Sequence, residues 1–132
     1  MKTGKSGIIG TFILLIGALS FASIIEADGV TKRIKFAKGR NSATVSGTVI
    51  RGDRDTYILG ARGGQTMTVS ITSREDNAVF QIETPDGDFL PRAGEMDDAR
   101  KWSGRLPADG DYRIIVGGTR GNASYKVTVS IR

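Results

Sequence analysis

Two kinds of charged side chain lie where they could do chemistry or bind a charged partner: arginines and carboxylates in predicted turns. An arginine guanidinium can hold a carboxylate with two parallel hydrogen bonds, so a group of arginines on one surface suits an acidic partner. A single loop arginine is more often simply solvated. The arginines in or beside predicted turns are Arg51, Arg54, Arg62, Arg74, Arg92, Arg100 and Arg120.

Arg120 has the most unusual setting, because it lies among glycines in the stretch GGTRGNAS, residues 117–124. Glycines on both sides allow the backbone to turn tightly and to enter a narrow space. A turn needs such glycines, but it does not need an arginine. The pattern therefore leaves two interpretations open, a solvated turn residue or a side chain presented to a partner.

Catalysis by the common nucleophilic arrangements is excluded, because the sequence contains no histidine and no cysteine. The same absence removes the usual transition-metal ligands. Paired carboxylates could hydrolyse glycosidic bonds, but most acidic residues here fall in turn motifs, where they bond the backbone. Asp97 and Asp98 lie in a longer connection and leave a calcium site conceivable. We predict that the protein is not an enzyme and has no cofactor or metal; a carboxylate hydrolase is the weaker alternative.

Residues 1–22 have the layout of a secretory signal peptide, with Lys2 and Lys5 followed by an apolar run. Ser20 and Ala22 provide the small residues of a cleavage site, and a second possible site follows Ala27. A retained membrane anchor is the alternative. Residues 23–132 then form one domain, which we expect to be periplasmic or secreted and free of the membrane. Its net charge falls from +5 to +3 when the two lysines are removed, which argues against nucleic acid as a partner.

The mature chain is predicted to be all-β, a two-sheet antiparallel sandwich of about eight strands with jelly-roll-like connections. Apolar and polar residues alternate with period two, and turn signals rich in Gly, Pro and Asp separate the segments. Val30, Ile34 and Phe36 are expected on one face of the first strand, and Trp102 is expected in the core. The predicted strands are 30–36, 41–50, 55–61, 66–73, 78–84, 100–106, 111–117 and 123–131.

Two stretches carry a family resemblance. Residues 34–71 and 106–131 resemble the two halves of the periplasmic inhibitors of g-type lysozyme, small exported proteins of Gram-negative bacteria. Similar motifs also occur in pre-peptidase C-terminal-type sandwich domains. The matching residues are Phe36 with Lys38-Gly39, Ser46-Gly47, Asp55-x-Tyr57, Ala61-x-x-Gly64-Gln65, the LPADGDY stretch, and Thr119-Arg120 in the last loop.

The resemblance implies an exported lysozyme inhibitor that inserts loops, notably 117–122, into the acidic cleft of a g-type lysozyme. A lysozyme cleft holds the carboxylates needed for catalysis, which an arginine could bind. The S-G-x-x-Y loop known from inhibitors of c-type and i-type lysozymes is absent after Ser46-Gly47. The residues expected on the partner-binding surface are Arg120, Thr119, Asn122, Arg54, Asp55 and Arg100. The alternative function is a stand-alone sandwich module that binds polysaccharide or an envelope protein.

Overall fold

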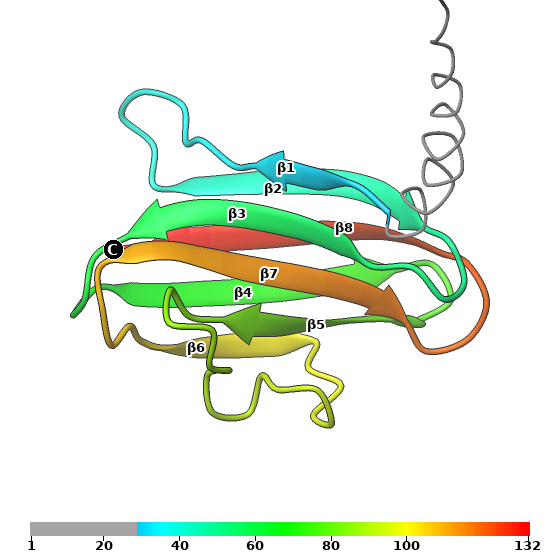
Figure 1. Cartoon of the computed structure of the whole chain (residues 1–132). Helices are drawn as coiled ribbons and strands as arrows, with labels where there is room; N and C mark the ends of the chain where they lie inside the picture. The colour runs from blue at the N-terminus through cyan, green and yellow to red at the C-terminus, as the bar shows by residue number, and fades with distance from the viewer. Residues whose placement is uncertain (1–28) are drawn as a thin grey trace, which may run out of the picture.

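The computed structural model describes residues 29–132 and shows eight β-strands (Figure 1). The predicted signal peptide lies outside the described residues. Seven of the predicted strands agree with the structure to within one residue at each end. The strands are β1 (Thr31–Arg33), β2 (Ser42–Val49), β3 (Asp55–Ala61), β4 (Thr66–Ser73), β5 (Ala78–Glu83), β6 (Lys101–Arg105), β7 (Gly110–Gly118) and β8 (Ala123–Ile131).

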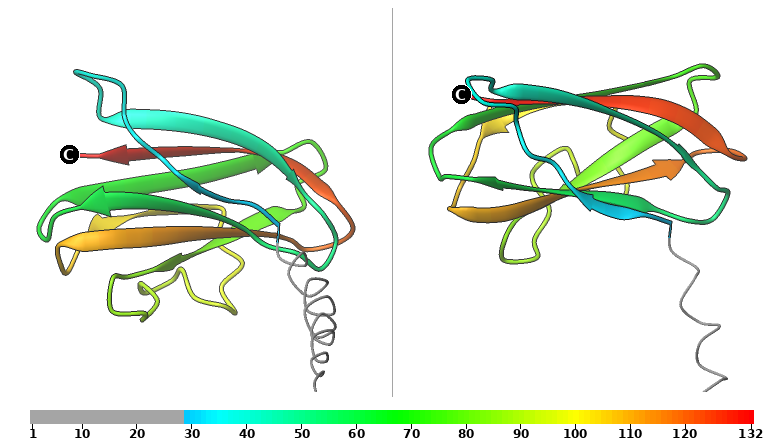
Figure 2. Two further views of the ribbon diagram at one scale, coloured as in Figure 1. Left: turned by 45° about the horizontal axis from the view of Figure 1, so that its top comes forward. Right: turned by 90° about the horizontal axis from the view of Figure 1, so that it is seen from above.

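The strands form two four-stranded sheets that stack as two layers (Figure 2). Sheet A has the order β1-β3-β7-β5, and sheet B has the order β2-β8-β4-β6. From β2 onward, consecutive strands alternate between the sheets, so every connection crosses from one layer to the other, as in a jelly roll. The predicted all-β sandwich is therefore confirmed. Within residues 29–132 there is no helix with the length and apolar character needed to cross a membrane.

The core lies between the two sheets and follows the period-two pattern of the strands. In β8 the side chains of Tyr125, Val127 and Val129 are buried, while the residues between them are exposed. Alternate side chains of a strand point to opposite faces, so each strand contributes one apolar row. Trp102 is 5% exposed, and its indole N–H donates to the Pro91 carbonyl (2.7 Å), which confirms the predicted core position.

The first strand differs from its prediction in length and direction. β1 spans only three residues and pairs parallel to β3, whereas a fully antiparallel sandwich was expected. Val30 lies outside the strand and is 44% exposed, although Ile34 is buried and Phe36 packs against the core. The strand is short because the chain must leave sheet A after Arg33 to reach β2 in sheet B. A parallel pair of this kind cannot be read from the alternation pattern, which is identical for both directions.

The long connection between β5 and β6 covers the free edge of sheet A. Backbone hydrogen bonds join Phe80 N–H to the Ala99 carbonyl (2.9 Å) and Ile82 N–H to the Ala93 carbonyl (2.9 Å). Leu90, Ala93 and Ala99 are buried. The segment therefore protects an edge strand whose unpaired backbone groups would otherwise be open to another chain.

A buried polar network connects the two sheets. The Tyr125 hydroxyl on β8 donates to Asp55 Oδ2 on β3 (2.6 Å), and the two tyrosine oxygens of Tyr57 and Tyr125 are 2.6 Å apart. Because Tyr125 has only one hydroxyl proton, Tyr57 is the donor in the second bond. Asp55 Oδ1 accepts from Val30 N–H (3.0 Å). Gly47 leaves the necessary space, since a Cβ there would lie 2.7 Å from the Tyr125 oxygen.

The network predicts a loss of stability in alkali. Burial, followed by the hydrogen bonds to Asp55 and Tyr57, raises the pKa of Tyr125 above its ordinary value of 10.0. The folded state therefore holds this proton more tightly than the unfolded state. The stabilisation is fully present below pH 10 and is lost as the pH rises above 10, where the unfolded tyrosine ionises. Urea midpoints measured from pH 8 to 11 should show the difference between the original protein and Tyr125→Phe shrinking; a constant difference would contradict this assignment.

Candidate partner-binding site

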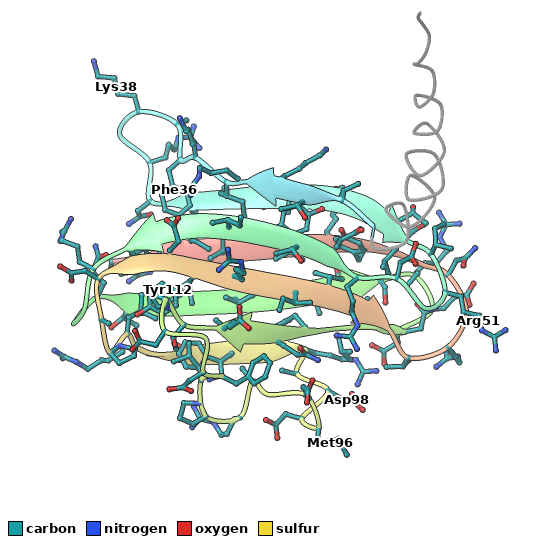
Figure 3. All side chains as sticks on the ribbon, viewed as in Figure 1. Phe36, Lys38, Arg51, Met96, Asp98 and Tyr112 are labelled. Carbon is teal, nitrogen blue, oxygen red and sulfur yellow. The ribbon has the colours of Figure 1, made fainter. Side chains whose placement is uncertain are left out.

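Three connections lie at the same end of the sandwich, and two of them, 50–54 and 119–122, carry predicted site residues. The strand register places Val49 beside Ala123, Ser73 beside Tyr125, and Ala78 beside Gly118. Connections 50–54, 74–77 and 119–122 are therefore neighbours, and we call this region the loop end. It lies on the right in Figure 1, and Figure 3 shows Arg51 projecting from it.

The 119–122 connection is held in one conformation by Asn77, which is 2% exposed. The Asn77 side-chain amide donates to the carbonyls of Arg120 (3.0 Å) and Asn122 (3.1 Å), and the Asn77 backbone carbonyl accepts from Thr119 N–H (2.9 Å). Gly121 has a φ of 64°, a conformation that glycine adopts without strain. The loop is thus rigid at its base and exposed at its tip.

The Arg120 side chain lies along the neighbouring 74–77 connection. Its Nη2 donates to the Glu75 carbonyl (2.7 Å), and the side chain is exposed. A guanidinium has five N–H donors in a planar fork, so most remain available to a partner. The contact with Glu75 restricts the side chain before binding, which reduces the entropy that binding would cost.

Arg54 and Thr119 line a shallow hollow on the outer face of sheet A, beside the loop end. The aliphatic part of Arg54 crosses Gly117, where an added Cβ would lie 3.3 Å from Arg54 Cδ. Glu95 and Asp98, from the long β5–β6 connection, line the same hollow. This part of the site therefore carries both signs of charge.

The side chains of Arg100 and Asn122 make contacts with the connections of the loop end. Arg100 Nε lies 3.2 Å from Asp76 Oδ1, and its Nη2 donates to the Asp76 carbonyl (2.9 Å). Asn122 Oδ1 accepts from Arg51 N–H (2.7 Å), which ties the 119–122 connection to the 50–54 connection. Both residues are exposed, but these contacts position neighbouring loops as well as offering groups to a partner.

Asp55 is a correction to the predicted surface. Asp55 is only 3% exposed, and both of its carboxylate oxygens accept hydrogen bonds from within the fold. A buried carboxylate that satisfies internal donors cannot also be presented to a partner. The D-x-Y motif, Asp55 with Tyr57, is therefore part of the inter-sheet network rather than of a binding surface.

Sequence reasoning missed two residues of the loop end. Asn77 follows the turn Arg74–Asp76, where an asparagine is normally explained as a turn former. Ile50 is 52% exposed at the start of the 50–54 connection and adds an apolar side chain beside the arginines. No signal in one sequence marks the role of Asn77, but Ile50 breaks the alternation of β2 and could have been noticed.

Asn77→Ala should increase the conformational mobility of the 119–122 connection. The variant removes both amide donors and leaves two loop carbonyls without partners, which should cost about 2 kcal/mol of unfolding free energy. We expect faster amide hydrogen exchange in residues 119–122, measured by mass spectrometry. Asn41→Ala, in an exposed residue of the opposite end, is the matched control. Equal exchange in both variants would show that Asn77 does not hold the loop.

The polar side chains of the loop end are used in hydrogen bonds that position the connections. Among residues 29–132, no group of three or more acidic, histidine or cysteine side chains could hold a metal ion. Asp97 Oδ2 accepts from Gly94 N–H (2.7 Å), which is the turn-forming role. The site consists of arginine-bearing loops, fixed by hydrogen bonds, at one end of a rigid sandwich. These features define the class as a β-sandwich with exposed, arginine-bearing loops gathered at one end.

Comparison with known proteins specifies this class further. The chain is 34% identical over 128 residues to the inhibitor of g-type lysozyme from Escherichia coli (strain K12), covering 91% of this chain and 93% of the relative. A periplasmic inhibitor of g-type lysozyme from Aeromonas hydrophila is structurally similar, with a TM-score of 0.66, 34% identity, and coverage of 80% and 100% of the two chains. The chain therefore belongs to the family of g-type lysozyme inhibitors, which are binding proteins and not enzymes.

One further comparison concerns the fold alone. The pre-peptidase C-terminal domain of a Bacillus anthracis collagenase has a TM-score of 0.56 at 17% identity, covering 77% of this chain and 94% of that domain. This likeness shows a shared sandwich fold only. No protein-family model matches the sequence.

Proposed function

We propose that this protein inhibits a g-type lysozyme in the periplasm after removal of residues 1–22. The observation that carries the proposal is the match to an inhibitor of g-type lysozyme along 91% of the chain. Its partner is then a protein, and the chain acts by occupying the enzyme rather than by catalysis.

In this proposal the loop end enters the substrate cleft of the lysozyme. Such a cleft is concave and carries the carboxylates that perform glycoside hydrolysis. The 119–122 connection would enter it, with Arg120 bound to a cleft carboxylate. Thr119, Asn122, Arg54 and Arg100 would contact the cleft rim, whereas Asp55 has no part in the contact.

Three features of the loop end support this mode of binding. The 119–122 connection is exposed at its tip and fixed at its base, so little flexibility must be lost on binding. The neighbouring 50–54 and 74–77 connections carry three further exposed arginines, Arg51, Arg54 and Arg74. Ile50 offers an exposed apolar side chain of the kind that fills the desolvated centre of an interface.

A titration against three lysozyme classes tests the function. Purified residues 23–132 would be added to goose-type, chicken-type and invertebrate-type lysozymes acting on a soluble chitin oligosaccharide. We expect inhibition of the goose-type enzyme at micromolar inhibitor or below, and none of the other two. Absence of inhibition of the goose-type enzyme at micromolar concentration would overturn the proposal.

A further inference from the structure

The outer face of sheet B has an unusual composition. The four strands β2, β8, β4 and β6 contain no aspartate and no glutamate. Every outward-facing position on them is either a hydroxyl residue or a cation. The cations are Lys101, Arg105 and Lys126, and the hydroxyl residues are Ser42, Thr44, Ser46, Thr48, Thr66, Thr68, Ser70, Thr72, Ser103, Ser124, Thr128 and Ser130. We call this surface the hydroxyl face.

Sheet A shows that this composition is not a general property of the protein. Its strands include Glu83 and Asp111, which pair with Arg113 and Arg33. Two of the three cations on the strands of sheet A, Arg33 and Arg113, thus have carboxylate partners within the same sheet. Those of the hydroxyl face have none there, so their charge is available to an external group.

Two shallow hollows on the hydroxyl face each contain a pair of cations. One is lined by Lys126 together with Arg74, and the other by Lys101 together with Arg92. Hydroxyl residues form most of the remaining lining, and neither hollow is lined by an acidic residue. Each hollow is therefore suited to a carboxylate, which accepts hydrogen bonds from both hydroxyls and ammonium or guanidinium groups.

We propose that the hydroxyl face binds an anionic cell-wall polysaccharide whose carboxylates lie on the peptides attached to its sugar chains. The register places Lys126 opposite Thr72 and Lys101 opposite Ser70 on β4, so their Cα atoms are about 12 Å apart. Arg105 lies four residues beyond Lys101 on the same strand, about 13 Å away. Cations spread in this way match a polymer with repeated charges better than one small anion.

The hydroxyl groups supply the neutral part of this binding. Three cross-strand pairs bond each other: Thr44 with Thr128 (3.0 Å), Thr48 with Ser124 (2.9 Å) and Thr68 with Ser103 (3.0 Å). Each hydroxyl has one donor and two acceptor lone pairs, so these pairs keep capacity for sugar hydroxyls. The mutual bonds also fix the side-chain rotamers before any ligand arrives.

The same face is poorly suited to other partners. A lipid surface is bound by basic residues combined with apolar side chains that insert into it, and no apolar side chain points outward from these strands. A stable protein interface has an apolar centre, which is equally missing. The polysaccharide site lies on the broad face of the sandwich and shares only Arg74, of the 74–77 connection, with the loop end at its tip. One molecule could therefore bind the polymer and a lysozyme together, although neither activity depends on the other.

Co-sedimentation with purified bacterial cell-wall sacculi tests the inference. Residues 23–132 should sediment with untreated sacculi at low salt and should stay in solution with sacculi whose carboxyl groups have been amidated. The variant Lys101→Gln/Arg105→Gln/Lys126→Gln should bind at least tenfold more weakly, because it removes three attractive charges from one surface. A control variant removes the same amount of charge from the 34–41 connection, where Figure 3 shows Lys38. This control, Lys35→Gln/Lys38→Gln/Arg40→Gln, should bind like the original protein.

Four results would overturn the inference: no sedimentation of the original protein, unchanged binding to amidated sacculi, equal losses in the two triple variants, or equally strong binding to vesicles of anionic phospholipid. Inhibition of a goose-type lysozyme on the soluble oligosaccharide is measured in parallel for all three proteins. It should be the same in each, so failure of the polysaccharide site is distinguishable from failure of the proposed inhibitory function.

Discussion

Arg120→Ala should weaken inhibition of a g-type lysozyme roughly 30-fold or more while the protein remains folded. Truncating an arginine that pairs with a desolvated carboxylate costs about 2 kcal/mol or more of binding free energy. The side chain is exposed and makes one hydrogen bond, to the Glu75 carbonyl, so the unfolding free energy should change by less than about 1 kcal/mol. Inhibition constants and urea unfolding curves of the same preparations provide both measurements.

Two companion variants make this result specific. Arg62→Ala removes an exposed arginine from the opposite end and should leave inhibition unchanged. Arg120→Lys keeps the charge but loses the planar fork, so it should inhibit with an intermediate constant. If Arg120→Ala inhibits as well as the original protein, Arg120 is a solvated turn residue and the loop end does not bind through it.

Asp55→Ala should destabilise the fold more than any surface change in this protein. The variant leaves the Tyr125 hydroxyl and Val30 N–H without their acceptor, and it removes a carboxylate from a site only 3% exposed. Unpaired buried donors cost about 1–3 kcal/mol each, so a loss of about 3 kcal/mol is expected. The midpoint of thermal unfolding should fall by roughly 10–20 °C.

Asp53→Ala is the matched control for this change, because Asp53 lies two residues away in the 50–54 connection and is only partly buried. It should alter the thermal midpoint by no more than about 3 °C. The prediction fails if Asp55→Ala and Asp53→Ala have the same midpoint of thermal unfolding. A large loss for Asp55→Ala would also explain why D-x-Y accompanies this fold, since the motif then serves folding rather than inhibition.

The elements of the fold could be predicted because they depend on local patterns. Period-two alternation of apolar residues, as in Tyr125 to Ile131, places one face of a strand against a core whatever its neighbours are. Glycine-rich and aspartate-rich turns then mark where each strand ends. The exceptions have a common cause. Both exceptions, the parallel direction of β1 and the covering of β5 by the 84–100 connection, depend on which segments pair with each other. A single sequence does not show which segments pair.

The candidate site could be predicted only in part, for the same reason. The positions of Arg120 and Arg54 in turns make them candidates, and the strand register places their two connections at the same end of the sandwich. Asp55 directly follows Arg54 in the sequence. It is, however, the first residue of β3, and the alternation of that strand directs its side chain into the core. Asn77 could not be recognised, because its partners, Arg120 and Asn122, are more than forty residues away.

By itself, the sequence determined the all-β class, the strands, the turns and the lack of histidine and cysteine chemistry, because each of these follows from residue type and short spacing. Only the tertiary structure decided which connections meet at the loop end, which carboxylate is buried, and that the hydroxyl residues of four separate strands form one acid-free face. Those are properties of strand order and register, which arise when segments distant in the chain pack around a common core.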